Sequence, residues 1–166
     1  MIILGRVTTV YHEIEDRISL TGEGPSGEVY HGWLTRRLFD LLLARLFKIL
    51  GGGTDESYAA VVNEFAQEKA EAALSPTVPV TAKLSEQKLD PVLITEIDIA
   101  ELEGAVQLSF RHSAEEGAVI PFAHQDVRQW LAIVRVAYKQ ADWPMRDWPD
   151  WLAERQAKPT ERPVFH

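Results

Sequence analysis

Residues 17–50 read RISLTGEGPSGEVYHGWLTRRLFDLLLARLFKIL, and this stretch decides the fold class. Residues 17–21 alternate polar and apolar side chains, which predicts a half-buried strand. Three glycines and a proline in residues 22–27 supply the backbone conformations of a turn, and residues 28–31 are expected to return as a second strand. From Thr35, the expected N-cap, leucines recur at helical spacing. The stretch therefore predicts a β-hairpin followed directly by a helix.

The predicted helix over residues 35–50 is apolar almost all round. One broad face carries Leu38, Leu41, Leu42, Leu46, Ile49 and Leu50, while Phe39, Leu43 and Phe47 lie largely off that face. A helix without a polar side is normally buried, so we expect this one to lie between two layers or against another chain. The glycines at 51–53 are expected to end it.

Upstream, residues 2–11 are rich in β-branched side chains and predict a first strand rather than a signal peptide. Downstream, a second helix is expected over residues 57–74, and its apolar side carries Tyr58, Val61, Val62, Phe65 and Ala72. Residues 75–91 contain three prolines, and we expect an extended, partly exposed connector there.

The order of elements repeats in the second half of the chain. Strands are expected at 92–99 and 105–111, followed by a returning strand at 118–122 and a helix over 124–141. A shift of 90 residues places Ile18 on Leu108 and Gly27 on Gly117. The match is mostly one of hydrophobic pattern, so it leaves open whether the halves are a duplication or share an architecture.

These patterns predict an α+β fold of antiparallel β-meanders, each followed by a helix, in two pseudo-repeated β-β-β-α units. We expect one domain over residues 1–153, with halves at 1–74 and 92–141 joined by the connector at 75–91. The tail at 154–166 is polar and contains prolines, and it is expected to be frayed. Because meanders leave unpaired edge strands, we also expect a homodimer.

Composition narrows the function classes. The 166 residues include no cysteine, which excludes disulfides, thiolate metal sites and a cysteine nucleophile, and favours a reducing, cytoplasmic location. The formal net charge of -8 disfavours nucleic acid and anionic membranes as partners. The longest apolar stretch is shorter than the roughly 20 residues that cross a bilayer. We therefore expect a water-soluble protein with no membrane partner and no cofactor.

Two arginines, Arg36 and Arg37, stand at the start of the helix predicted from Thr35. Positive charge is unfavourable at a helix N-terminus, so an anion or an acidic partner would explain both residues. Alternatively, they pair with a local acid such as Asp40 and cover a sheet edge with their aliphatic stems.

The segment from Trp33 to Leu38, WLTRRL, resembles a stretch in a small family of uncharacterised bacterial proteins, in which a strand runs into a similar sequence. The resemblance covers six residues. It implies a bacterial origin and no assigned activity, and it assigns no functional residue.

Three of the five tryptophans, Trp143, Trp148 and Trp151, lie within nine residues and are interrupted by Pro144 and Pro149. Each indole buries on the order of 200 Å² when it docks. We therefore expect this segment to occupy a groove of its own domain, of a sister subunit or of another protein, with Trp151 starting a short last helix.

No catalytic pattern stands out. The five histidines lack metal-ligand spacing, the carboxylates form no calcium loop, and no serine lies in a nucleophile elbow. The prediction is a non-enzymatic assembly or protein-interaction module, with neither a catalytic residue nor a metal site.

Two alternatives remain. The first is a single-stranded nucleic-acid binder with a whirly-like sheet, which would need a basic and aromatic sheet face built from Arg6, Tyr11, Arg17, Tyr30 and Arg111. The second is a small-molecule pocket between sheet and helices, where Arg36, Arg37 and a histidine would converge.

Overall fold

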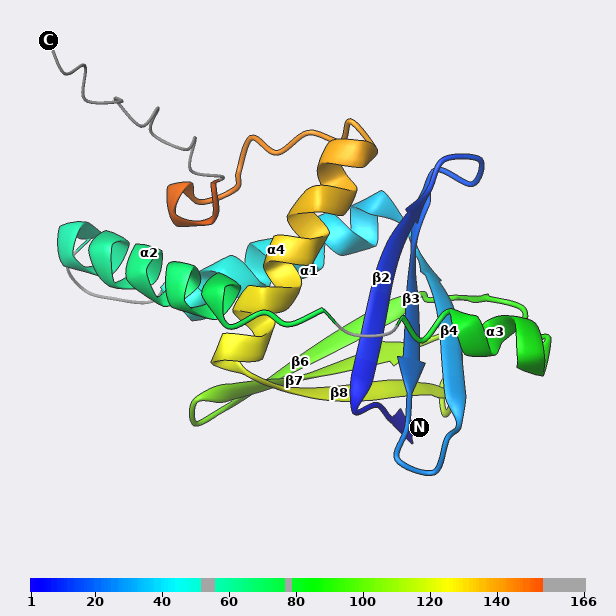
Figure 1. Ribbon diagram of the computed structural model, residues 1–166. Helices are drawn as coiled ribbons and strands as arrows, with labels where there is room; N and C mark the ends of the chain where they lie inside the picture. Colours follow the sequence, from blue (N-terminus) through cyan, green and yellow to red (C-terminus); the bar gives the residue numbers. More distant parts are fainter. Residues whose placement is uncertain (52–55, 77–78, 154–166) are drawn as a thin grey trace, which may run out of the picture.

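The computed structural model describes residues 1–51, 56–76 and 79–153, and Figure 1 shows their arrangement. The strands of these ranges are β1 (Ile2–Ile3), β2 (Arg6–His12), β3 (Arg17–Glu23), β4 (Val29–Leu34), β5 (Val92–Leu93), β6 (Glu96–Leu102), β7 (Ala105–Arg111) and β8 (Gly117–Ala123). The helices are α1 (Arg36–Gly51), α2 (Glu56–Ala72), α3 (Ala82–Gln87), α4 (His124–Gln140) and the short 3₁₀-helix η1 (Asp150–Leu152).

The strands form two four-stranded sheets, in the orders β2-β3-β4-β5 and β1-β8-β7-β6. In each sheet, three antiparallel strands come from one half of the chain and a two-residue strand comes from the other half. Thus β1 pairs in parallel with β8, and β5 pairs in parallel with β4. Each half therefore completes the sheet of the other.

The helices cross between the halves in the same way. Helix α4 packs against β2 of the first half, and α1 packs against β6 of the second. The indole Nε1 of Trp130 on α4 donates to the hydroxyl of Thr9 on β2 at 2.8 Å. On the other side, Arg45 of α1 pairs with Glu101 of β6 at 3.0 Å. In Figure 1, α1 and α4 lie together beside the two sheets, and one continuous core fills the space between them.

The α+β class and the repeated order of strands and helix are confirmed. The predicted β-β-β-α units are present, and each predicted first strand is split by a crossover, which adds the two-residue strand β1 or β5 before the unit. The backbone N–H of Leu4 donates to Val119 and that of Ile94 donates to Trp33. Leu4 and Ile94 are both buried at these crossings, which joins the two sheets at equivalent places.

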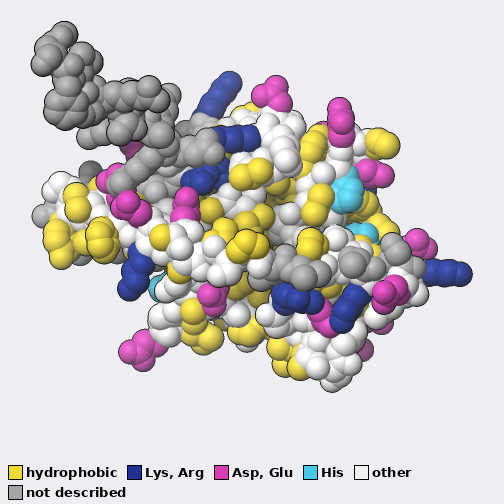
Figure 2. All heavy atoms as spheres, in the orientation of Figure 1, with side chains coloured by type: hydrophobic (Ala, Val, Ile, Leu, Met, Phe, Trp, Pro, Cys, Tyr) yellow, Lys and Arg dark blue, Asp and Glu magenta, His cyan; other side chains and the backbone are white. Residues whose placement is uncertain are grey.

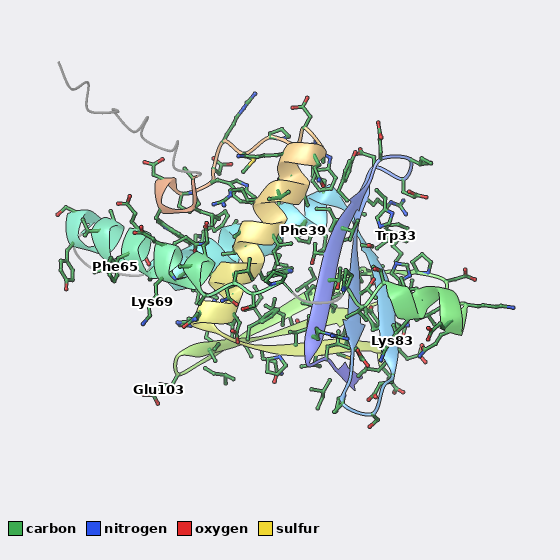
Figure 3. All side chains as sticks on the ribbon, in the orientation of Figure 1. Trp33, Phe39, Phe65, Lys69, Lys83 and Glu103 are labelled. Carbon is green, nitrogen blue, oxygen red and sulfur yellow. The ribbon has the colours of Figure 1, made fainter. Side chains whose placement is uncertain are left out.

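Helix α1 begins as predicted, because the Thr35 hydroxyl accepts a hydrogen bond from the N–H of Leu38 at 3.4 Å. Its buried face differs from the prediction. Phe39 and Leu43 lie in the core, whereas Leu41 is 62% exposed. Phe39, which is labelled in Figure 3, is held inside because the aromatic rings of Trp130 and Tyr138 on α4 pack against it.

The connector at 75–91 is not wholly extended, because it contains α3. Val80 before this helix is fully buried. Its N–H donates to the Thr8 hydroxyl at 3.0 Å, and Lys83 on α3 pairs with Glu23 at the end of β3. These contacts dock α3 beside the first sheet. The expected frayed tail lies outside the described residues.

Candidate functional site

Helix α2 contacts the rest of the protein through its polar face. Asn63 and Gln67 are buried against α4. The Arg128 guanidinium donates to Asn63 Oδ1 at 2.6 Å, and Gln67 Nε2 donates to the Arg128 carbonyl at 3.0 Å. One turn further on, Arg135 pairs with Glu71 at 3.2 Å. The interface between α2 and α4 is therefore made of hydrogen bonds and an ion pair.

The apolar face of α2 consequently points into solvent. Tyr58 is 72% exposed and Phe65 is 70% exposed, and Val61 and Val62 between them are also exposed. We call these four residues the outer stripe. Figure 2 shows hydrophobic side chains gathered at the end of the molecule where α2 lies in Figure 1. The predicted apolar side of the helix is therefore its exposed side, because the polar partners of Arg128 lie against α4.

Residues 143–151, which we call the tryptophan segment, pack on their own chain. Trp143 is buried, its indole Nε1 donates to Asp16 at 3.1 Å, and its ring meets that of Tyr138 edge-on at 5.1 Å. Trp151 is the second residue of the 3₁₀-helix η1, and the centre of its ring lies 4.8 Å from the guanidinium carbon of Arg128. The sequence left three docking places possible for these rings: their own domain, a sister subunit or another protein. Trp143 and Trp151 pack in their own domain.

A cavity of about 750 Å³ lies between α1 and the tryptophan segment. We call it the α1 pocket. Its lining residues are Arg36, Asp40, Leu43, Ala44, Phe47, Lys48, Gly51, Pro144, Arg146, Asp147 and Trp148. Two residues singled out from the sequence, Arg36 and Trp148, therefore meet at one site.

The remaining candidates lie elsewhere. Arg37 lines a smaller depression of about 400 Å³ with Leu38, Leu41 and Leu93. Trp143 is in the core, and Trp151 contacts α4. Arg36 and Arg37 thus face different cavities, because neighbours on a helix point about 100° apart.

Asp40 links the α1 pocket to the core. The Tyr138 hydroxyl donates to Asp40 at 2.8 Å, and Arg36 Nε lies 3.9 Å from the same carboxylate. Burial, followed by the hydrogen bond to Asp40, raises the pKa of Tyr138, so its phenol stays a proton donor. The ion pair with Arg36 that the sequence suggested is therefore present, and the phenol occupies the other oxygen of Asp40.

Two histidines meet on the outer face of the first sheet, around Trp33 of β4. The rings of His12 and His31 lie 4.8 and 5.7 Å from that of Trp33, which is labelled in Figure 3. His12 Nε2 is 2.8 Å from Ser19 Oγ. Burial lowers the pKa of His31, and the nearby His12 adds to this, against a hydrogen bond that the ring donates to the backbone of Leu89, which raises the pKa. His31 is therefore favoured as a neutral ring.

Among the described residues, no group of three or more histidines and carboxylates could hold a metal ion. No histidine of the described ranges lines either cavity, and Arg36 and Arg37 line different ones. The sequence analysis did not identify the cationic pocket residues Lys48 and Arg146. They lie almost 100 residues apart in the chain, so no local pattern links them.

Within the part of the chain that the structure describes, no helix has the length and apolar character needed to span a membrane. No family model, no curated protein and no solved structure matches this chain.

Proposed function

We propose that this protein is a non-enzymatic assembly module that pairs with a second copy of itself through the outer stripe of α2. The supporting observation is that this helix turns its polar face to the protein and its apolar face to solvent. Its polar residues are used for internal docking, and its aromatic and β-branched residues are left in water. Exposed apolar patches of this kind mark interaction surfaces. A second helix laid on the stripe would cover it.

The size of the stripe fits a small symmetric interface. Tyr58 and Phe65 together expose on the order of 300 Å², since each aromatic side chain carries about 150–250 Å². Two copies, with the valines and the flanking stems included, would bury roughly 1,000 Å² in total, which is the lower bound for a specific interface. A dimer formed in this way is expected to be reversible and to depend on concentration.

The chemistry of the stripe is self-complementary. Lys69 continues it, four residues after Phe65, and both lie on the same side of α2 in Figure 3. An antiparallel pair of α2 helices centred between Val62 and Phe65 would bring Lys69 of one copy over the Tyr58 ring of the other. A lysine above a tyrosine ring is a favourable cation–π contact. The stripe itself carries no acid, so two chains of net charge -8 can meet there with little local repulsion.

The described contacts give less support to nucleic-acid binding. That alternative needs free arginines and stacking rings on one sheet face. Arg6 is paired with Glu23 at 2.6 Å and Arg111 with Asp98 at 3.1 Å. Tyr30 is buried. A strand of bases would have to displace these ion pairs to reach the arginines.

Sedimentation velocity over a dilution series tests the proposal. The unmodified chain should shift from dimer to monomer on dilution, and Phe65→Glu should remain a monomer at every concentration. The matched control is Ile14→Glu, because Ile14 is 96% exposed and lies away from α2. The control should dimerise like the parent. Thermal melting of both variants should match that of the parent, since both side chains face solvent.

Two results would overturn the proposal. One is a parent chain that stays monomeric at the highest concentration. The other is a Phe65→Glu variant that dimerises as well as the Ile14→Glu variant, which would place the contact outside the stripe.

A further inference from the structure

We infer that the α1 pocket binds a small anion that carries an aromatic ring. The inference is independent of the dimer, because the pocket lies between α1 and residues 144–148, whereas the outer stripe lies on α2. It combines a ligand-sized cavity, an excess of cations and an aromatic wall.

The volume of the α1 pocket suits a small molecule. The volume of about 750 Å³ falls within the range of about 300–1,000 Å³ that is usual for ligand pockets. A molecule with one or two rings and a carboxylate fits this space. A folded partner does not, because the cavity is bounded by α1 on one side and by the tryptophan segment on the other.

Charge selects an anion. Arg36, Lys48 and Arg146 line the pocket together with Asp40 and Asp147. Asp40 already accepts the Tyr138 hydrogen bond and lies beside Arg36, so its charge is largely compensated. Among the described residues, Lys48 and Arg146 form no ion pair. Asp147 offsets one of these two charges, so three cations and two carboxylates leave the lining with a net charge of +1. The Arg146 guanidinium can bind one carboxylate of a ligand through two parallel hydrogen bonds.

The aromatic wall selects a ring. Phe47 of α1 and Trp148 are both half-buried at the cavity, and their ring centres lie 5.4 Å apart in a T-shaped arrangement. Trp148 also contacts Tyr138 at 5.1 Å, which fixes the indole from behind. An aromatic ligand can pack against this corner at a favourable distance, as aromatic pairs do in protein cores.

The core also holds the site in place. Tyr138 and Leu43 beneath the pocket are fully buried, and Trp143 anchors the start of the segment that forms its other wall. A preformed wall lowers the ordering entropy of binding, which favours affinity for a small ligand.

The test uses naphthalene-2-carboxylate as the probe and its uncharged analogue naphthalene-2-methanol as the comparison. Isothermal titration of the full chain should show the carboxylate binding about tenfold more tightly than the alcohol, since one charge-assisted hydrogen bond accounts for such a factor. Heteronuclear NMR should show the Trp148 indole resonance, assigned with Trp148→Phe, shifting with the same midpoint.

Variants then test which cationic side chains bind the carboxylate of the probe. The double variant Lys48→Gln with Arg146→Gln should lose about tenfold in affinity for the carboxylate and little for the alcohol. Arg37→Gln is the matched control, because Arg37 lies on the same helix but lines the other depression. Phe65→Glu should bind the probe normally, which separates this site from the outer stripe.

Three results would overturn the inference. They are equal binding of the acid and the alcohol, an equal loss in the Arg37→Gln variant, and an unchanged Trp148 resonance at saturation. Binding of naphthalene-2-carboxylate that disappears in Phe65→Glu would assign the probe to α2 instead. The solution mass of the parent is measured separately, so failure here leaves the dimer proposal standing and failure of the dimer leaves this one standing.

Discussion

The guanidinium carbon of Arg128 lies 4.8 Å from the centre of the Trp151 ring, and the same side chain donates to Asn63 at 2.6 Å. One buried arginine on α4 therefore joins α2 and the C-terminal segment. A second guanidinium hydrogen bond reaches the Leu50 carbonyl at the end of α1, at 3.4 Å. The outward orientation of α2 depends on this arginine, because it gives the polar face of the helix its partners.

Replacing Arg128 by methionine should lower the free energy of unfolding by about 3 kcal/mol, since Asn63 and Leu50 would each lose a partner inside the protein. Urea denaturation measures this change. Arg45→Met serves as the control, because Arg45 forms an exposed ion pair whose loss should change stability by less than about 1 kcal/mol. Equal effects of the two substitutions would show that Arg128 does not organise the helices.

Tyr30 should make the protein sensitive to alkali. Burial of this side chain raises its pKa from 10.0 to about 12, so the folded state favours the neutral phenol. The stability this provides is complete below pH 10 and declines as the pH rises through about 12, because the unfolded chain ionises first. The decline cannot exceed about 1.4 kcal/mol per pH unit for one proton.

The difference in unfolding free energy between the parent and Tyr30→Phe isolates this contribution from that of other titrating groups. It should be constant up to pH 10 and should then shift in favour of the phenylalanine variant. A difference that stays constant to pH 12 would show that Tyr30 ionises as freely in the folded chain as in the unfolded one.

Gly117 begins β8 at a point where the backbone of β7 comes very close. A Cβ atom added there would lie 2.1 Å from the Phe110 carbonyl oxygen and 3.0 Å from Arg111 Cα. Gly117→Ala should therefore push the two strands apart and destabilise the fold by about 2 kcal/mol. Thermal unfolding of the parent and of Gly117→Ala measures this loss of stability.

Gly51 at the end of α1 offers the opposite case, because no atom of the described residues outside its own helix turn lies within 4 Å of its added Cβ. Gly51→Ala should be neutral or stabilising by up to about 1 kcal/mol, since alanine is the better helix former. If both alanine variants behave alike, the close approach of β7 and β8 at Gly117 is not tight in solution.

Local patterns in the sequence predict most elements of this fold but not how the halves combine. The alternation in residues 17–21 and the N-cap at Thr35 act over a few residues, and the strand and the cap are both confirmed. The strand is not half-buried as predicted, because Ser19 and Thr21 are buried as well as Ile18 and Leu20. The two-residue strands β1 and β5 are too short to show a period, so their exchange between sheets has no local signal. Leu4 and Ile94, which directly follow these two strands, are both buried at the crossings.

The same limit applies to the sites. Hydrophobic periodicity placed the residues of the outer stripe on one side of a helix, but it gave no sign that this side faces solvent. The orientation is set by Arg128, which lies about 60 residues further along the chain. Likewise, the sequence singled out Arg36 and Trp148 separately, and only the packing of the tryptophan segment on α1 places them at one cavity.

The central claim is that two α2 helices pair through their outward faces, and a single-cysteine cross-link tests it most directly. The chain contains no cysteine, so Val62→Cys introduces one thiol in the middle of the outer stripe, and Ile14→Cys introduces one at a highly exposed control position. Mild oxidation followed by non-reducing electrophoresis should convert Val62→Cys to a covalent dimer while Ile14→Cys stays a monomer. Cross-linking of Val62→Cys no faster than that of Ile14→Cys would contradict the pairing of α2 with a second copy.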